Sequence, residues 1–387
     1  MTAQTSRATQ TNIDFVVFQT YYETGALFTS SSDNIAWIGS LQGFFLLLVG
    51  FISGPLYDRG YLRALLISGT FLTVFGYMMT SLCHTLWQAI LAQGVCVGIG
   101  GGLLFVPSVA ILPTYFRRRL GLAIGLAASG SSTGGVIYPI VFYKLIGQVG
   151  FGWTTRIIGF ISLATLIVPV LVLKQRIKPA KARALIDTTA FKDFDYMFFC
   201  IGTFIGFIGL YVMLFYLSYF ANASHIADDK MSFYLVPILN AASVFGRTVP
   251  NAISDKTGPF NMIAPGAMIC GILTFCMIAL TNLGGIIVIA ILFGFFSGVF
   301  IALPPVCFAV LTPDKSKLGT RIGMGFGFIA FSTLLGGPGT GGIIGNNRAD
   351  LHFTDAWIYG GVVLLAASCF FYYLRVKRGG LKLKVKV

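Results

Sequence analysis

The sequence predicts an all-α polytopic membrane protein, and three observations lead to that fold class. First, 56% of its 387 residues are hydrophobic and only 10% are charged, which leaves too little polar surface for a water-soluble protein of this length. Second, the mean hydropathy is +0.83. Third, the uncharged residues form long runs separated by short polar segments, and each run is long enough, or nearly so, to cross a bilayer as a helix.

The uncharged runs follow one another in two groups. Residues 1–34 form a polar tail in which only 15–18 is continuously apolar, so we expect no complete spanning helix there. The runs lie at 35–57, 64–82, 86–116, 120–143 and 157–173, and then at 196–221, 231–254, 260–280, 284–311, 322–345 and 356–374. We therefore expect about 11 spans, five in the first group and six in the second.

The polar segments between the runs set the domain boundaries. We expect an N-terminal bundle at 35–173, a basic linker at 174–193, a C-terminal bundle at 194–375 and a basic tail at 376–387. Of the 27 Lys and Arg residues, 22 fall on the side of the membrane that holds the linker and the C-terminus. Because basic loops remain in the cytosol, this count predicts that both segments are cytosolic.

The same topology explains two other features of the sequence. The net charge of +14 does not indicate a nucleic-acid partner, because the basic residues lie between spans and form no patch with aromatic residues. The sequon Asn222-Ala223-Ser224 falls outside the cell, so Asn222 is a candidate glycosylation site.

Charged residues are concentrated in one short segment, Gly54-Pro55-Leu56-Tyr57-Asp58-Arg59-Gly60-Tyr61-Leu62-Arg63, between two uncharged runs. A fainter copy, Asp255-Lys256-Thr257-Gly258, follows 197 positions after Asp58 and suggests two related halves. Glycine lets neighbouring helices approach, and Asp and Arg can pair with groups at helix ends. We therefore expect these residues to form a conformational latch, and its members are Gly54, Asp58, Arg59, Gly60, Arg63, Asp255, Lys256 and Gly258.

These motifs resemble those of a known family. The segment 54–63 resembles the signature loop between the second and third helices of the major facilitator superfamily, and 255–258 lies where the second copy belongs. The segment 115–119 followed by 122–130 resembles the fifth-helix signature of the monocarboxylate porters, especially the fungal members. The resemblance implies two pseudo-symmetric bundles that rock about a central cavity. It also implies a first helix before Val17, where the sequence has only the polar tail, so we expect that helix to be missing.

Five polar residues inside the expected spans are candidates for substrate binding. Arg247 lies roughly 12 Å inside the cytosolic end of its span and fits the eighth-helix Arg of the family, although Ser243 stands where animal members have an Asp. It can anchor an anionic substrate, or it can reach the headgroups or the loop at Asp255. The uncharged candidates can bind a ligand or join helices to one another, and they are Gln42, Gln93, Tyr138 and Asn240.

Other chemistry finds no support in the sequence. No Asp or Glu lies in the middle of an expected span, and the three His and seven Cys residues show no metal-ligand spacing. Gly130-Ser131-Ser132-Thr133-Gly134 matches the Gly-x-Ser-x-Gly pattern of hydrolases, but it sits inside an apolar run without the required turn. We therefore expect no metal, no cofactor and no enzymatic activity.

The expected function follows from the resemblance. It implies a secondary transporter of the plasma membrane that carries a small organic acid or a lipophilic, acidic metabolite, and fungal members of the family include exporters of secondary metabolites. The expected partners are the lipid bilayer and an anionic or lipophilic small molecule, with the protein as a monomer. The alternative is a transporter-like sensor or an inactive, truncated carrier. Flux in proteoliposomes distinguishes them, because a sensor binds its ligand without moving it.

Overall fold

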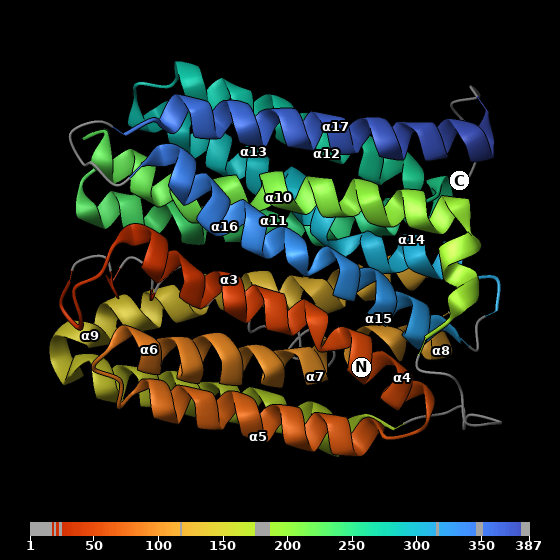
Figure 1. Ribbon diagram of the computed structural model, residues 1–387, viewed down its shortest axis with the longest axis horizontal. Coiled ribbons are helices and arrows are strands. Elements are labelled where there is room, and N and C mark those ends of the chain that lie inside the picture. The colour runs from red at the N-terminus through yellow and green to blue at the C-terminus, as the bar shows by residue number, and fades with distance from the viewer. Residues whose placement is uncertain are drawn as a thin grey trace.

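The computed structural model describes residues 18, 21–22, 25–116, 118–174, 186–314, 317–345 and 351–380, and within them every regular element is a helix (Figure 1). Nine described helices are long and apolar enough to span a membrane. One of these, Leu120–Val172, is two helices joined at Gly150, which has a φ of 71°. The 29-residue helix α11 (Asp229–Thr257) also has the length to span. The described residues thus contain the eleven segments that the sequence predicts.

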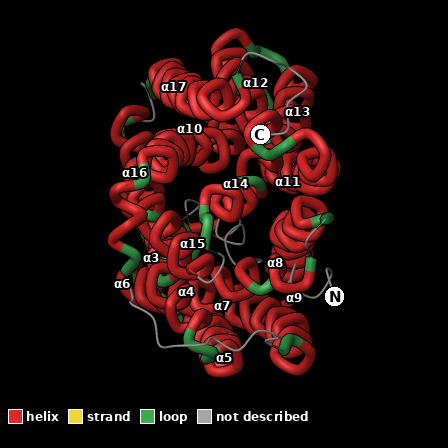
Figure 2. The backbone as a smooth tube through the Cα atoms, turned by 90° about the vertical axis from the view of Figure 1, so that its right-hand side faces the viewer, coloured by secondary structure: helices red, strands yellow, loops and turns green. Residues whose placement is uncertain are grey.

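The helices form two groups that pack against each other, as the end-on view shows (Figure 2). The N-terminal bundle contains α3 (Ser32–Leu48), α4 (Gly50–Asp58), α5 (Leu62–Thr80), α6 (Leu86–Ala89), η2 (Ile90–Val97), α7 (Gly98–Ala110), α8 (Leu112–Tyr115) and α9 (Leu120–Val172). The C-terminal bundle contains η3 (Thr188–Lys192), α10 (Phe194–Ala223), α11, α12 (Phe260–Cys276), η4 (Met277–Ala279), α13 (Leu283–Ala302), α14 (Pro304–Leu311), α15 (Leu318–Ile329), α16 (Phe331–Ile344) and α17 (Phe353–Gly379).

The two bundles repeat one packing motif. Gly98 and Gly102 of α7 lie against α3, where added Cβ atoms would come within 2.9 Å of the Gln42 carbonyl and 2.8 Å of the Phe45 carbonyl. Gly294 and Gly298 of α13 lie against α11, where the corresponding distances are 2.1 Å to the Leu239 carbonyl and 2.7 Å to the Ser243 carbonyl. Small residues four positions apart allow helix backbones to touch. This shared geometry supports the two related halves expected from the sequence.

Several boundaries differ from those expected. The segment 54–63 was expected to be a loop, but residues 54–58 complete α4 and only 59–61 form the turn before α5. The helix that contains the fourth expected span continues beyond residue 143 to the kink at Gly150. Residues 144–149 contain no proline, so every backbone N–H there can donate a helical hydrogen bond. In the linker, residues 187–193 fold back on the C-terminal bundle through η3, and 175–185 lie outside the described residues.

Aromatic residues near the N-terminus belong to the first bundle. Phe18 and Tyr22 are buried, and the Phe18 ring lies 5.0 Å from that of Phe142 in α9. Most other residues of the expected polar tail are not among those that the structure describes. The expectation that no helix precedes Val17 falls on residues 1–17, which are among those not described.

Candidate functional site

A cavity of about 110 Å³ lies between the two bundles, lined by residues from both. Its wall is largely apolar, with a group of aromatic rings contributed by Phe105, Phe207, Tyr211, Phe215 and Phe326. The polar side chains that line it are Ser131, Asn240, Ser243, Arg247 and Ser297. Such a cavity, apolar with a few placed polar groups, is typical of small-molecule sites.

Arg247 is the one charged residue among the described residues that line the cavity. It is only 3% exposed. Its Nε donates a hydrogen bond to Ser243 Oγ (3.1 Å), and its Nη1 donates to the carbonyl oxygen of Ala128 (2.9 Å) and to Ser131 Oγ. All three acceptors are neutral, and within the described part of the chain no carboxylate pairs with this guanidinium. A buried cation without a counter-ion is costly in a membrane protein and marks a functional site.

Two helices of different bundles bring these groups together. Ala128 and Ser131 lie on α9, whereas Arg247 lies on α11. The helices touch because Gly125 faces the α11 backbone, where an added Cβ would come within 2.2 Å of the Arg247 carbonyl oxygen. The guanidinium therefore reaches across the boundary between the bundles and bonds to the Ala128 carbonyl oxygen, which also accepts a hydrogen bond from the Ser131 hydroxyl (2.9 Å).

Further polar atoms at the cavity are left without protein partners. Asn240 uses its Nδ2 to donate to the carbonyl oxygen of Val236 (3.0 Å), and no described residue bonds to its Oδ1. Within the same description, neither Nη2 of Arg247 nor the hydroxyl of Tyr211 has a hydrogen-bond partner. These three side chains can supply donors and acceptors to a ligand in an otherwise apolar space.

The structure places the other predicted binding residues away from the cavity. Gln93 accepts a hydrogen bond from the Tyr22 hydroxyl (2.7 Å), and the Tyr138 hydroxyl lies 3.1 Å from Ser162 Oγ. Gln42 is buried and packs under Gly98. All three residues lie inside the N-terminal bundle, where hydrogen bonds of Gln93 and Tyr138 link separate segments and the Gln42 backbone packs against α7. The two that line the cavity are Arg247 and Asn240.

The polar residues of the cavity wall that sequence reasoning missed are Ser131, Tyr211, Ser243 and Ser297. Ser243 was noted only as a departure from the family pattern, and Ser131 only as part of a hydrolase-like motif. One signal was available for Ser243, because it lies four residues before Arg247 and so shares its helix face. Nothing in the sequence indicated that Ser131 or Tyr211 faces the cavity.

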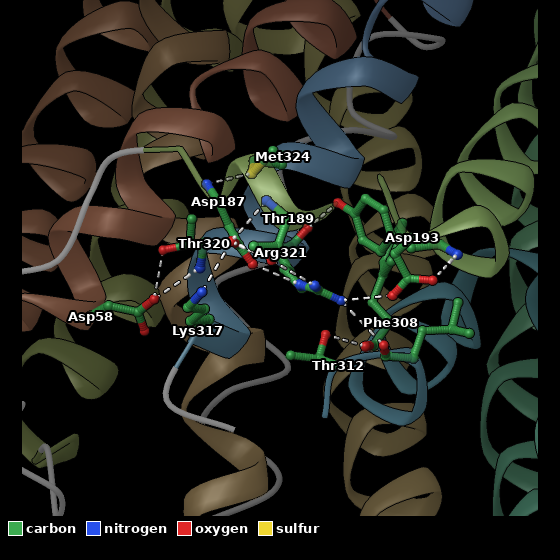
Figure 3. Close-up of polar contacts among 12 residues, drawn as sticks. Asp58, Asp187, Thr189, Asp193, Phe308, Thr312, Lys317, Thr320, Arg321 and Met324 are labelled. Carbon is green, nitrogen blue, oxygen red and sulfur yellow. Dashed lines mark hydrogen bonds and ion pairs between the residues drawn. The ribbon is translucent and has the colours of Figure 1, made fainter. Parts of the chain in front are cut away.

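Two carboxylates hold the bundles together at the C-terminal ends of α4 and α11. Asp58, the last residue of α4, accepts hydrogen bonds from Thr320 N (2.9 Å) and Thr320 Oγ1 (3.0 Å) in the first turn of α15 (Figure 3). Asp255, near the end of α11, accepts from the backbone nitrogens of Gly121 (2.7 Å) and Leu122 (3.1 Å) in the first turn of α9. Each carboxylate caps free N–H groups at the positive end of a helix in the opposite bundle.

The glycines of the expected latch have separate roles in this arrangement. An added Cβ on Gly54 would lie 2.5 Å from the Gly319 carbonyl oxygen, so this residue permits α4 to approach α15. Gly60 and Gly258 have φ values of 99° and 96° and end α4 and α11, respectively, in a conformation that other residues rarely adopt. The expected basic members of the latch are exposed on the surface, and these are Arg59, Arg63 and Lys256.

The linker is tied to the same end of α15 by a cluster of ion pairs. Arg321 donates to Asp187 (2.9 Å) and to Asp193 (3.1 Å), and Lys317 lies 3.0 Å from Asp187 (Figure 3). Burial alone would raise the pKa of the Asp187 carboxyl. Hydrogen bonds from Thr189, Arg321 and Lys317 outweigh burial and hold that pKa well below its usual range. The first turn of α15 is thus fixed by the linker on one side and by Asp58 on the other.

Comparison with known proteins adds independent findings. The family model described as Major Facilitator Superfamily matches residues 8–315. The chain is 60% identical over 354 residues to the MFS-type transporter dbaD of Emericella nidulans, covering 92% of this chain and 80% of the relative. It is 38% identical to the Aspyridones efflux protein apdF of the same organism (92% and 73% covered). It is 37% identical to the MFS-type transporter pynF of Aspergillus niger (92% and 83% covered).

Proposed function

Because this chain belongs to the Major Facilitator Superfamily, and is a membrane transporter like its relatives, we propose that it exports a lipophilic organic anion. Transport would proceed by alternating access of the central cavity, without ATP. The proposal includes the finer resemblance to monocarboxylate porters, a place in the plasma membrane, and a cytosolic linker and C-terminus. The word efflux in the name of the relative apdF supports export as the direction.

One observation carries the substrate class, namely the buried Arg247 guanidinium at the cavity. Its protein partners are neutral and its Nη2 is unpaired within the described residues, so an anion entering the cavity would find a cation with donors available. Charge-assisted hydrogen bonds to a guanidinium are about twice as strong as neutral ones. Arg247 is therefore assigned the acidic group of the substrate.

The rest of the cavity fits the body of such a molecule. The rings of Phe105, Phe207 and Phe215 offer apolar and aromatic surface, which favours a lipophilic or aromatic skeleton. Asn240 and Tyr211 would bond to a hydroxyl or carbonyl group on that skeleton. Asn222 lies in the last turn of α10, at the end opposite the linker, and its glycosylation remains a prediction of the proposed orientation.

Flux in proteoliposomes tests this function. We would use naphthalene-1-sulfonate, because a sulfonate stays charged and does not leak across the bilayer as a neutral acid. The matched probes are neutral naphthalene-1-sulfonamide, which keeps the ring and lacks the charge, and hexane-1-sulfonate, which keeps the charge and lacks the ring. We expect the aromatic anion to be transported best.

Arg247→Gln is the decisive variant. It removes the charge and keeps a polar side chain, so we expect transport of the sulfonate to fall by at least about tenfold. Arg247→Lys, which keeps the charge, should restore part of the loss. Unchanged flux in Arg247→Gln would exclude this residue as the anion anchor. Binding of the sulfonate without any flux in the native chain would favour the sensor alternative over the transporter.

A further inference from the structure

The hydrogen bonds of Arg247 join the two bundles. From this we infer that Ala128 and Ser131 act as an internal substitute for the substrate anion, so that Arg247 locks the empty carrier and an incoming anion releases the lock. The inference deepens the proposed function and rests on it for the identity of the releasing ligand. It assigns Ser131 a role in transport as a positioning residue that acts through Arg247.

The geometry of the lock is specific to one pair of helices. Nη1 of Arg247 bonds to two groups on α9, the Ala128 carbonyl oxygen at 2.9 Å and Ser131 Oγ. Ser243 Oγ, one turn earlier on α11, receives Nε at 3.1 Å and so holds the side chain in line with α9. The guanidinium is planar. Hydrogen bonds from Nε to α11 and from Nη1 to α9 therefore also fix the direction of Nη2.

The lock and a bidentate substrate anion compete for Nη1. Such an anion accepts from two guanidinium nitrogens at once, so besides the unpaired Nη2 it would need an N–H of Nη1 that now bonds to α9. An N–H of Nη1 that points at Ser131 cannot at the same time donate to an anion in the cavity. A negatively charged oxygen is a stronger acceptor than a serine hydroxyl or a peptide carbonyl, especially in an apolar cavity where charges are weakly screened. An anion would therefore displace the α9 groups, and α9 and α11 would lose their polar bond across the bundle boundary.

The arrangement also explains how a buried cation is tolerated between transport cycles. Without Ser131 and the Ala128 carbonyl oxygen, Arg247 would present desolvated donors to an apolar cavity, which is costly. Because these partners are neutral, they satisfy the donors of Nη1 while remaining weaker acceptors than an anion. A carboxylate in their place would hold the guanidinium more tightly and would oppose substrate binding.

The first arm of the test needs no ligand. Hydrogen–deuterium exchange of the full chain in nanodiscs would follow backbone amides of 120–135 in α9 and 240–257 in α11. We expect Ser131→Ala to raise exchange in both segments about fivefold, the change that corresponds to one lost hydrogen bond. Thr133→Ala is the matched control, because its hydroxyl bonds only within α9, to the Ser129 carbonyl oxygen (3.0 Å), and it should leave exchange unchanged.

The second arm measures binding of naphthalene-1-sulfonate. Ser131→Ala removes a competitor of the ligand, so its affinity for the sulfonate should rise about fivefold, and saturating sulfonate should raise exchange in the native chain as the substitution does. A serine that only supported the fold would leave affinity unchanged or lower it. Equal exchange in Ser131→Ala and Thr133→Ala, or weaker sulfonate binding in Ser131→Ala, would overturn the lock.

The two arms separate this inference from the proposed function. If the sulfonate is carried in an Arg247-dependent manner but Ser131→Ala changes neither exchange nor affinity, the function stands and the lock fails. If the sulfonate does not bind, a rise in ligand-free exchange in Ser131→Ala still supports the lock, and the proposed substrate class is what fails.

Discussion

Two boundaries between the bundles, α9 against α11 and α4 against α15, share the same two contacts, which we call the shared frame: a capping Asp and a close-packed glycine. In each, an Asp at the end of one helix caps the first turn of the other, Asp255 at the first boundary and Asp58 at the second. In each, a glycine meets a backbone carbonyl of the opposite helix. Added Cβ atoms would lie 2.2 Å from the Arg247 oxygen at Gly125 and 2.4 Å from the Gly50 oxygen at Gly323.

The boundaries differ at the residue that supplies this carbonyl. On α11 that residue is Arg247, which bonds across to α9, whereas on α4 it is Gly50, which has no side chain to do so. The neighbouring contact on α4 is apolar, because Phe51 packs against Gly327 of α15. The difference teaches that closure and substrate recognition are separable. Both boundaries carry the parts needed to close, and only α9 against α11 carries the group proposed to recognise an anion.

The largest effect should come from breaking the shared frame. Gly125→Ala and Gly323→Ala each place a methyl group against a backbone carbonyl that cannot move aside, which costs about 1–3 kcal/mol of closure. We expect both variants to raise hydrogen–deuterium exchange in the helices that they separate. Gly342→Ala in α16, where an added Cβ meets nothing within 4 Å, is the control. Exchange that stays at the native level in both variants would show that the two boundaries do not close as described.

A smaller effect should come from the two capping carboxylates. Asp58→Asn and Asp255→Asn remove a charge at a helix N-terminus but keep an acceptor, so each should weaken closure by about 0.5–2 kcal/mol. If the frame is shared, the two variants should raise exchange by similar factors, each at its own boundary. An effect confined to one of them would mean that the two boundaries are not equivalent in closure.

The linker sharpens the comparison, because its ion pairs hold Lys317 and Arg321 at the start of α15. Asp187→Asn leaves Arg321 partly unpaired and should lower the free energy of unfolding by about 1–3 kcal/mol. The exposed pairs of Asp195 with Lys377 and Arg378 provide a control, and Asp195→Asn should cost less than about 1 kcal/mol. Thermal unfolding in detergent measures both. Equal losses in the two variants would contradict a special role for the linker cluster.

The smallest effect concerns pH. The pKa of Asp187 is lowered in the folded protein, so the stability that its carboxylate adds is fully present above the ordinary Asp value of about 3.9. That stability is lost only as the pH falls below this value toward the folded pKa. The difference in unfolding temperature between Asp187→Asn and the native chain should therefore stay constant between about pH 5 and about pH 7. A difference that shrinks within this range would show that Asp187 titrates there.

Hydropathy was sufficient to predict the fold, because each span must satisfy its backbone within a helix and bury apolar side chains in lipid or protein. Charge was sufficient to find Asp58, since it lies in a short charged segment between two uncharged runs, and Asp255 followed from the fainter copy of that segment. The cavity was harder to predict. A helix such as α10 is apolar on every side, so its sequence does not show whether Tyr211 faces lipid, protein or the cavity. For the same reason Gln42, Gln93 and Tyr138 were expected at the site and lie instead inside one bundle.

The neutral partners of Arg247 give the transport cycle an electrical asymmetry. An empty site bears the positive charge of Arg247 inside the spanning helix α11, whereas a site loaded with the proposed monoanion bears no net charge. A membrane potential that is negative inside acts on the empty site with up to about 2.3 kcal/mol per 100 mV for each charge that moves fully across. For an exporter this favours return of the empty carrier to the cytosol. Export from proteoliposomes should therefore be faster under an inside-negative diffusion potential than at zero voltage.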